Sequence, residues 1–410
     1  MVLPSVGARH ASPLHGHATG KTRYALGLCL LCVLVLLALT GCGPQEAGST
    51  PTTQPPTATS EAGSTSTAQP PTPTSESGGA AQQPDNTPTE QAAQGTPTAA
   101  VAANTFQNPV FRSDFPDPEI IKEGDTFYAY ATNGLGRNIQ VATSPDLVHW
   151  KLLNDAMPAL APWAKLGGLH VWAPEVIKIG QRYVMYYTAR DKKADRQCVG
   201  VATSDKPDGP FQDTSDHALV CQADEGGSID PDPFRDGDKL YLYWKNDGNC
   251  CNQPTYIYVQ ELAPDGLSLT GQPTQLVRND APWEGQVVES PTMWKQDGKY
   301  YLFFSGNSYA GFDYAVGYAT CQTVTGPCQD ATENPILKSH TEKPLVVGPG
   351  HEAIIKVGDE TWIVYHAWEV TSAGTRGSRR FMWIDRLDWK DGKPDVIGPT
   401  TDPQPAPVVK

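Results

Sequence analysis

The stretch Ala173-Pro174-Glu175-Val176-Ile177-Lys178 recurs in related form at five places in the C-terminal three-quarters of the chain. The other four copies begin with Asp117-Pro118-Glu119, Asp230-Pro231-Asp232, Glu289-Ser290-Pro291 and His351-Glu352-Ala353. Each copy is followed by a glycine turn and an aromatic, β-branched run that alternates with period two, which is typical of β-strands. A fixed internal period of this kind indicates a stacked or radial array of similar units.

The five copies are almost evenly spaced along the chain. With Asp117, Ala173, Asp230, Ser290 and His351 set in register, the steps are 56, 57, 60 and 61 residues. About four strands fit into each repeat, which predicts an all-β fold, a five-bladed β-propeller. A β-sandwich would not explain repetition at this length. No long amphipathic helix pattern is present after residue 104.

The composition divides the chain into three regions. Residues 1–42 carry a basic segment, an apolar run and the ending Leu39-Thr40-Gly41-Cys42, which predicts a signal peptide with a lipobox and lipidation of Cys42. An ordinary secretory signal or an uncleaved N-terminal anchor is the alternative. Residues 43–104 are rich in Thr, Pro and Ser and predict a disordered linker. Residues 105–405 form the predicted propeller, in which Phe106 to Phe111 would complete the last blade and close the ring.

Charge and cysteine content limit the function classes. The formal net charge of −14 argues against a nucleic-acid partner, which requires clustered basic residues. Six cysteines fall in the propeller region, and an even number outside the cytosol favours disulfides over a metal site. We expect the local pairs Cys198–Cys221 and Cys321–Cys328. For the adjacent Cys250 and Cys251, a bridge to each other and bridges to other cysteines both remain open.

Three of the repeat starts carry a carboxylate at nearly the same point. Because the first strand of each blade lines the central channel, Asp117, Asp230 and Glu289 should converge at one mouth of it, together with His351. Glycoside hydrolysis uses one carboxylic acid to protonate the leaving oxygen and a second carboxylate to activate water. A third carboxylate nearby favours the protonated form of the acid. A single Asp-Pro pair is better explained as a turn, but recurrence at matched blade starts favours a catalytic role.

The motifs around these positions resemble the ordered motifs of glycoside hydrolase family 43 over about residues 105 to 400. They are Phe115-Pro116-Asp117-Pro118, Trp172-Ala173-Pro174-Glu175, Ser228-Ile229-Asp230-Pro231, Val288-Glu289-Ser290-Pro291 and Gly348-Pro349-Gly350-His351. The resemblance implies a five-bladed propeller and an inverting enzyme that degrades arabinan or xylan. It also implies that Asp117 is the general base, Glu289 the general acid, and Asp230 the residue that modulates and orients the acid.

Other residues are candidates for substrate binding. Phe115 and Trp172 flank blade starts and are expected to form an apolar wall against a sugar face, with core packing as the alternative. The resemblance implies that His351 holds a water or a metal in the channel, or acts as a hydrogen-bonded histidine without metal. Arg380 resembles the family arginine that reaches a substrate hydroxyl, although Arg376 and Arg379 lie close by. No cofactor is expected to be required; the channel would hold a water or a single Ca²⁺ ion.

The sequence as a whole predicts a monomeric, lipid-anchored protein of the cell surface, or otherwise a secreted one. The expected substrate is an arabinose- or xylose-containing polysaccharide or its oligosaccharides, and the expected activity is that of an α-L-arabinofuranosidase or arabinanase. A β-xylosidase is the alternative within the family; such members commonly add a C-terminal β-sandwich, which does not follow the fifth repeat here. A non-catalytic glycan-binding propeller is the alternative from another class. A retaining, invertase-like enzyme would need an opening motif that this sequence lacks.

Overall fold

The structure is a computed structural model that describes residues 104–167, 170–341 and 345–409. The predicted signal peptide, the lipidation site Cys42 and nearly all of the predicted linker lie outside these residues. The described ranges consist of β-strands and connecting loops, with three short 3₁₀ helices: η1 (Ala223–Glu225), η2 (Gly248–Cys251) and η3 (Pro282–Glu284). Among the described residues, no helix has the length and apolar character needed to cross a membrane.

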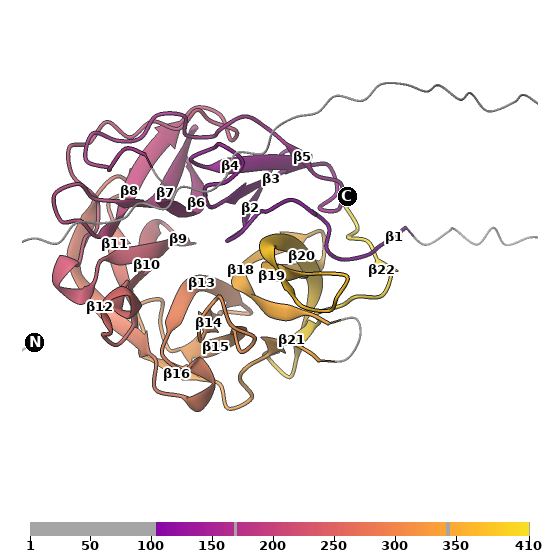
Figure 1. The fold of residues 1–410 in the computed structure, drawn as a ribbon. Helices are drawn as coiled ribbons and strands as arrows, with labels where there is room; N and C mark the ends of the chain where they lie inside the picture. Colours follow the sequence, from indigo (N-terminus) through magenta and orange to yellow (C-terminus); the bar gives the residue numbers. More distant parts are fainter. Residues whose placement is uncertain (1–103, 168–169, 342–344, 410) are drawn as a thin grey trace, which may run out of the picture. The chain divides into compact units, whose positions relative to one another are not determined.

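Five β-sheets are arranged around a central axis, which confirms the predicted propeller (Figure 1). Blade one consists of β2 (Glu119–Glu123), β3 (Thr126–Ala131), β4 (Gln140–Ser144) and β5 (Lys151–Leu152). Blade two consists of β6 (Val171–Ile179), β7 (Arg182–Arg190) and β8 (Gln197–Ser204). Blade three consists of β9 (Ser228–Asp236), β10 (Lys239–Asn246), β11 (Tyr256–Leu262) and β12 (Leu269–Arg278). Blade four consists of β13 (Val288–Gln296), β14 (Lys299–Gly306), β15 (Ala315–Cys321), β16 (Cys328–Asp330) and β17 (Leu337–Lys338). Blade five consists of β18 (Val347–Val357), β19 (Glu360–Val370), β20 (Arg376–Lys390) and β21 (Lys393–Ile397).

The first described segment of the chain returns to the last blade. Strand β1 (Thr105–Phe106) pairs with β22 (Gln404–Pro405), which follows blade five. Further along, Phe111 forms an antiparallel bridge to Met382 in β20. The segment thus contacts blade five, through this bridge and through hydrogen bonds between the Asn108 side chain and the backbone of Ile384. The prediction that it completes the blade is wrong, because blade five has four strands of its own and β1 and β22 form a separate two-stranded sheet.

The core lies between neighbouring blades, and the period-two pattern of the strands explains why. In β7, Tyr183, Met185 and Tyr187 pack in the cluster shared with blade one. The alternate residues Val184 and Tyr186 pack in the cluster shared with blade three. Because both faces of a blade meet another blade, both faces are apolar, and the second strands read as aromatic runs rather than alternating with polar residues.

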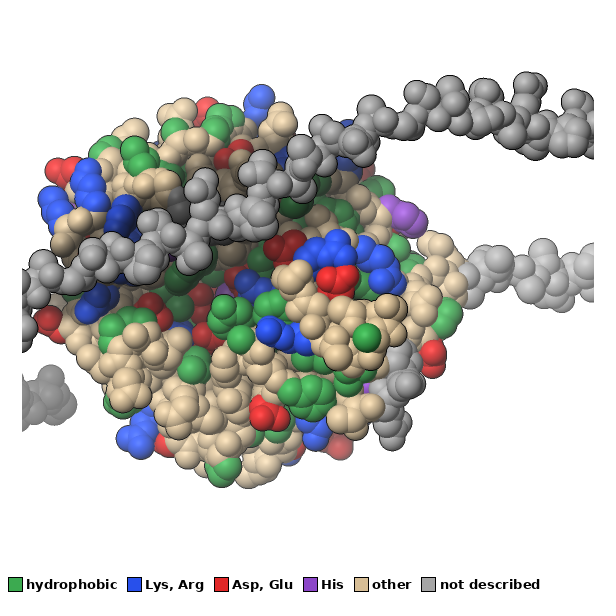
Figure 2. All heavy atoms as spheres, viewed as in Figure 1, with side chains coloured by type: hydrophobic (Ala, Val, Ile, Leu, Met, Phe, Trp, Pro, Cys, Tyr) green, Lys and Arg blue, Asp and Glu red, His purple; other side chains and the backbone are tan. Residues whose placement is uncertain are grey.

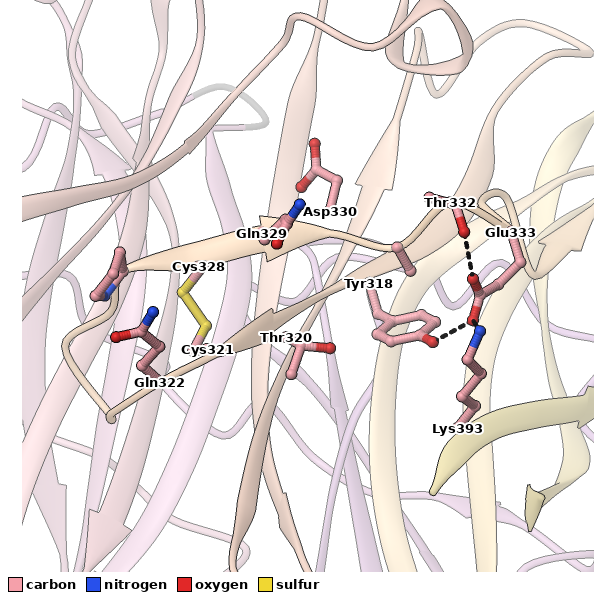
Figure 3. Close-up of a pocket in the computed structure, with 12 residues that line it drawn as sticks. Tyr318, Thr320, Cys321, Gln322, Cys328, Gln329, Asp330, Thr332, Glu333 and Lys393 are labelled. Carbon is pink, nitrogen blue, oxygen red and sulfur yellow. Dashed lines mark hydrogen bonds and ion pairs between the residues drawn. A yellow bond between two sulfur atoms is a disulfide. The ribbon is translucent and has the colours of Figure 1, made fainter. Parts of the chain in front are cut away.

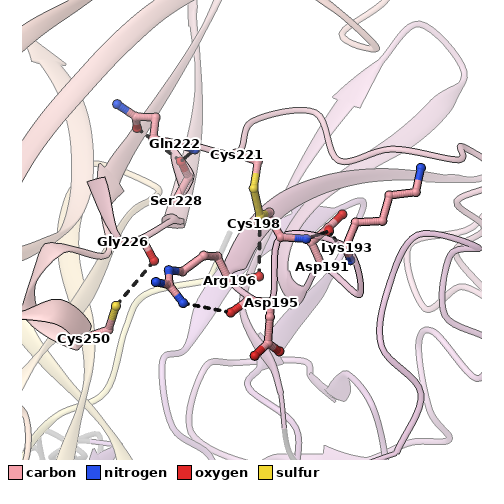
Figure 4. Close-up of a disulfide and its surroundings, with 11 residues drawn as sticks. Asp191, Lys193, Asp195, Arg196, Cys198, Cys221, Gln222, Gly226, Ser228 and Cys250 are labelled. Carbon is pink, nitrogen blue, oxygen red and sulfur yellow. Dashed lines mark hydrogen bonds between the residues drawn. A yellow bond between two sulfur atoms is a disulfide. The ribbon is translucent and has the colours of Figure 1, made fainter. Parts of the chain in front are cut away.

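Three disulfides fasten the blades and their loops. Cys198 and Cys221 are joined in blade two (Figure 4), and Cys321 and Cys328 link the paired strands β15 and β16. Both predicted pairs are confirmed. Cys250 and Cys251 bond to each other within η2, which settles the alternative that the sequence left open.

Candidate active site

The five positions that the repeat sets in register share an unusual backbone conformation. Asp117, Ala173, Asp230, Ser290 and His351 all have positive φ, between 42° and 57°. Residues other than glycine seldom occupy this region. The first strands of blades two to five also shift register against their second strands at this point, as in a β-bulge. Strained residues of this kind cluster at functional sites, and here they mark one end of the channel.

Four of the five residues immediately before these positions face a cavity. It has a volume of about 530 Å³, and Pro116, Trp172, Ile229 and Glu289 line it from four different blades. The cavity also contains Asp117, Asp230, His351 and Arg380. Except for Phe115, all the residues predicted to act in catalysis or substrate binding therefore meet in one place. Figure 2 shows charged side chains gathered around the hollow at the centre of this face.

A larger cavity, of about 630 Å³, lies elsewhere, along the outer strands of blade four (Figure 3). It is lined by the Cys321–Cys328 disulfide, Tyr318, Glu333 and Lys393. Glu333 accepts a hydrogen bond from Tyr318 and forms an ion pair with Lys393, so its negative charge is already compensated. Since this cavity contains none of the three predicted carboxylates, size does not decide the location of the active site.

A ring of polar residues, called the second ring below, lies next to the five left-handed positions and holds them in place. These residues directly follow the aromatic run of each second strand, and four of them accept a hydrogen bond from the backbone N–H of a left-handed residue in the next blade. The four bonds run from Ala173 to Thr132 (2.9 Å), from Asp230 to Thr188 (3.3 Å), from His351 to Ser305 (2.9 Å) and from Asp117 to His366 (3.2 Å). These bonds fix the strained backbone and tie blades together at four of the five junctions between neighbouring blades.

Asp117 lies among hydrogen-bond donors and cations. Its Oδ1 is 2.7 Å from Nη1 of Arg380 and 3.4 Å from Nδ1 of both His351 and His366. Its Oδ2 accepts a hydrogen bond of 2.5 Å from Thr132. Burial opposes ionisation of this carboxyl, but Arg380, His351 and Thr132 outweigh it and hold the pKa of Asp117 below its usual range. Nδ1 of His366 accepts the N–H of Asp117, and burial lowers the pKa of His366, so this ring is neutral. Asp117 is therefore a carboxylate at neutral pH, which is the form that a general base requires.

Asp230 and Glu289 lie on adjacent blades. Burial raises the pKa of Asp230 to about 6; the charges of Glu289 and Asp117 act in the same direction, against those of His351 and Lys245. Oδ2 of Asp230 accepts a hydrogen bond of 3.1 Å from the backbone N–H of Ser290, the residue after Glu289. This bond connects Asp230 directly to the strand that carries the predicted acid.

The structure distinguishes between the three arginines that the sequence left open. Arg379 forms an ion pair with Glu369, and the guanidinium of Arg376 packs over Trp368. Only Arg380 of the three reaches the cavity, where it binds Asp117 and packs over the Tyr309 ring, 5.0 Å from its centroid. The prediction that Arg380 lies in the site is confirmed.

The prediction that Phe115 forms part of the sugar-binding wall is wrong. Phe115 is fully buried and packs edge-on against Phe111 in the cluster between blades one and five. It lies two residues before the left-handed position, whereas Trp172 lies one residue before it. Successive side chains of a strand point to opposite sides, so Trp172 reaches the cavity and Phe115 the core.

Several residues in or behind the cavity were not identified from the sequence. Lys245 is fully buried behind Glu289, with its Nζ 3.0 Å from Oε2 of that residue. Asp247, Asn249 and Tyr309 line the cavity itself. Lys245 had a signal, because it directly follows an aromatic run at the position taken by Thr188 and His366 in other blades. The other three lie in loops that differ from repeat to repeat and gave none.

Asp232 gives rise to a testable dependence of stability on pH. It is buried in β9, two residues after Asp230. Burial raises the pKa of Asp232 to about 7, and its Oδ2 accepts a hydrogen bond from the backbone N–H of Met293. A raised pKa means that the folded state binds the proton more tightly, so this contribution to stability is full below about pH 4 and is lost as the pH rises towards 7. We expect the free energy of unfolding to fall between pH 5 and pH 8, and to fall less steeply in Asp232→Asn, by up to about 1.4 kcal/mol per pH unit. Denaturant titrations at several pH values would measure both slopes; equal slopes would contradict the assignment.

Nδ1 of His351 faces Asp117, whose carboxylate also pairs with Arg380. Nε2 of the neighbouring His366 is buried without a hydrogen-bond partner in the protein. In the described part of the chain, one group of three acidic or imidazole side chains lies close enough to share an ion, namely Asp280, Glu284 and Asp330. It belongs to the loop before β13 and to β16, and it does not include His351. That His351 holds a water or a metal ion stays a prediction, and the mechanism below assigns no step to a metal.

Comparisons with known proteins agree with this geometry. The model of the family "Glycosyl hydrolases family 43" matches residues 106–394. A probable arabinan endo-1,5-α-L-arabinosidase A of Aspergillus flavus is 25% identical over 304 residues, which cover 68% of this chain and 90% of that protein. An extracellular endo-α-(1→5)-L-arabinanase of Thermotoga petrophila is 30% identical over 266 residues, 55% of this chain and 52% of that protein. The crystal structure of a thermostable family-43 glycoside hydrolase is 35% identical and superposes with a TM-score of 0.68, covering 75% of this chain and 100% of that one. The chain thus belongs to glycosyl hydrolases family 43, and it is a glycosidase.

Proposed function

We propose that this glycosidase releases L-arabinose, with inversion, from α-linked arabinofuranosyl units of plant hemicellulose or pectin side chains. One observation carries the proposal: a single cavity holds Asp117, which is kept ionised, together with Asp230 and Glu289 from two neighbouring blades. The names of the similar proteins, which describe arabinan-degrading enzymes, support arabinose as the sugar.

In the proposed mechanism, Asp117 acts on the attacking water. Its carboxylate accepts a proton from the water while the water oxygen forms a bond to the anomeric carbon. Arg380 and Thr132 hold the two carboxylate oxygens through separate hydrogen bonds, so the base has a fixed orientation. Because the water attacks from the side opposite the leaving group, the anomeric configuration inverts.

Glu289 acts on the leaving oxygen. It donates its proton to the glycosidic oxygen as the bond between that oxygen and the anomeric carbon breaks, and it ends the step as a carboxylate. Asp230 orients the strand of Glu289 through its hydrogen bond to Ser290 N–H, and its own charge favours a protonated neighbour. Trp172 would offer the bound sugar an apolar wall, since it lines the same cavity.

The first test is hydrolysis of aryl α-L-arabinofuranoside, aryl β-D-xyloside and linear 1,5-arabinan by the wild-type protein, with and without a chelator. Product anomers would be followed by NMR. We expect arabinose release with inversion and no loss on chelation, because no step uses a metal. Xylose release alone would change the substrate to xylan, and retention would overturn the roles of Asp117 and Glu289. Glycan binding without turnover of any substrate would instead favour a non-catalytic surface propeller.

The proposal includes the location of the enzyme. A lipid on Cys42 and the linker at 43–104 would hold a monomeric propeller outside the cell, where the polysaccharide is found. The similar arabinanase described as extracellular supports export, and the three disulfides fit an oxidising compartment.

A further inference from the structure

The second ring of polar residues is interrupted at one position. In four blades, Thr132, Thr188, Ser305 and His366 accept the N–H of the next blade's left-handed residue. Blade three has Lys245 at this position, and it pairs in the strand with Ile229, just before Asp230, as Thr188 pairs with Trp172. An ammonium group cannot accept a hydrogen bond. The N–H of Ser290 therefore bonds to Asp230 instead.

The interruption brings a buried cation to the predicted acid. Lys245 has no exposed surface, and its Nζ lies 3.0 Å from Oε2 of Glu289 and 2.7 Å from Oδ1 of Asn249. The charge of Lys245 also opposes the rise that burial causes in the pKa of Asp230 and of Asp247. Burying an ammonium group is costly even when it is paired, so such an ion pair is weak evidence of a role in stability. A hydroxyl at this position would keep the ring intact, as it does in blades one, two and four.

The partner of Lys245 is held by a cross-linked turn. Asn249 lies in η2, next to the bond between Cys250 and Cys251. The backbone N–H of Gln253 closes this turn on Gly248, and Nδ2 of Asn246 donates to Pro254, so the loop is fixed at both ends. Cys250 itself lines the cavity. The side chain of Asn249 is thereby presented to Lys245 from a rigid segment.

We propose that Lys245 is a positioning residue for the general acid, an inference that rests on the proposed function. Its ammonium, anchored by Asn249, binds Oε2 of Glu289 and leaves Oε1 to carry the proton towards the leaving oxygen. When that proton is transferred and the bonding electrons pass to the leaving oxygen, Glu289 becomes a carboxylate, and Lys245 stabilises the charge that appears on it. Preorganised charge of this kind acts where charge develops in the transition state.

The test compares two substrates that differ in their need for an acid. Phenyl α-L-arabinofuranoside has a poor leaving group that must be protonated, whereas the 2,4-dinitrophenyl compound has one that departs unprotonated. In Lys245→Met we expect kcat for the phenyl substrate to fall by about 10²-fold, within the range of general acid catalysis, and kcat for the dinitrophenyl substrate to fall less than about tenfold. Lys245→Arg keeps the charge and should recover part of the selective loss.

Two further variants keep the test decisive. Asn249→Ala changes an exposed side chain, so it should fold even if Lys245→Met does not, and it should show the same selective loss to a smaller degree. Lys295→Met removes a lysine of blade four from a partly exposed pair with Asp236 of blade three, and it should leave the hydrolysis of both substrates unaffected. An equal loss on both substrates in Lys245→Met and Asn249→Ala would overturn the inference while leaving the proposed function standing. No turnover of either substrate by the wild-type protein would overturn both.

Discussion

Replacing Asp117 with asparagine is expected to lower kcat by about 10³-fold on every substrate, with KM changed by less than about tenfold. Asparagine cannot take the proton of the attacking water. Its side-chain oxygen can still accept from Arg380, and its amide can turn towards Thr132, whose hydroxyl also accepts hydrogen bonds. The cavity should therefore keep its shape while it loses the base. Steady-state kinetics on aryl arabinofuranosides and on 1,5-arabinan would measure the loss.

Asp216→Asn is the matched control for this prediction. Asp216 forms its ion pair with His217 at an almost fully exposed position, so the substitution changes the same chemical group far from the cavity. Kinetic constants of Asp216→Asn should equal those of the wild type. Activity of Asp117→Asn within a factor of about ten of the wild type would exclude Asp117 as the base.

The positions at the channel mouth could be predicted from the sequence because the repeat is a property of the whole chain. Setting five similar segments in register identified Asp117, Asp230 and His351 before any geometry was known, and all of them have the same left-handed backbone. Phe115 was assigned incorrectly because register alone does not give the side to which a residue points. Applying the period of two within the repeat would have placed Phe115 with Val171, which is also buried.

Lys245 shows a different limit of sequence reasoning. Its position in the repeat could be read from the sequence. Its role, however, depends on the replacement of a hydrogen-bond acceptor by the Lys245 ammonium, a donor, at the interface between blades three and four. That consequence appears only when the hydrogen bond of Ser290 is seen to move to Asp230. The loop residues Asn249 and Tyr309 depend on the path of segments with no counterpart in the other blades, so no register exists from which to infer them.

Glu289→Gln is expected to lose activity in a way that depends on the leaving group. Glutamine has no acidic proton, so kcat on 1,5-arabinan and on phenyl α-L-arabinofuranoside should fall by about 10³-fold. The 2,4-dinitrophenyl substrate needs no protonation, and its kcat should fall by less than about tenfold. Because the Oε atom of glutamine can still accept from Lys245, the ion pair becomes a hydrogen bond and the strand should stay in place.

The contrast between the two substitutions is the stronger evidence. Every substrate requires an activated water, so Asp117→Asn should slow all of them alike, whereas Glu289→Gln should spare the substrate with the best leaving group. Both variants would be measured on the same set of aryl arabinofuranosides. The loss of kcat relative to the wild type should not depend on the leaving group in Asp117→Asn, and it should depend strongly on the leaving group in Glu289→Gln. If the two dependences were exchanged, the base and the acid would have to be exchanged as well. If both were flat, neither carboxyl would protonate the leaving oxygen, and Asp230, which has a raised pKa in the same cavity, would become the candidate acid.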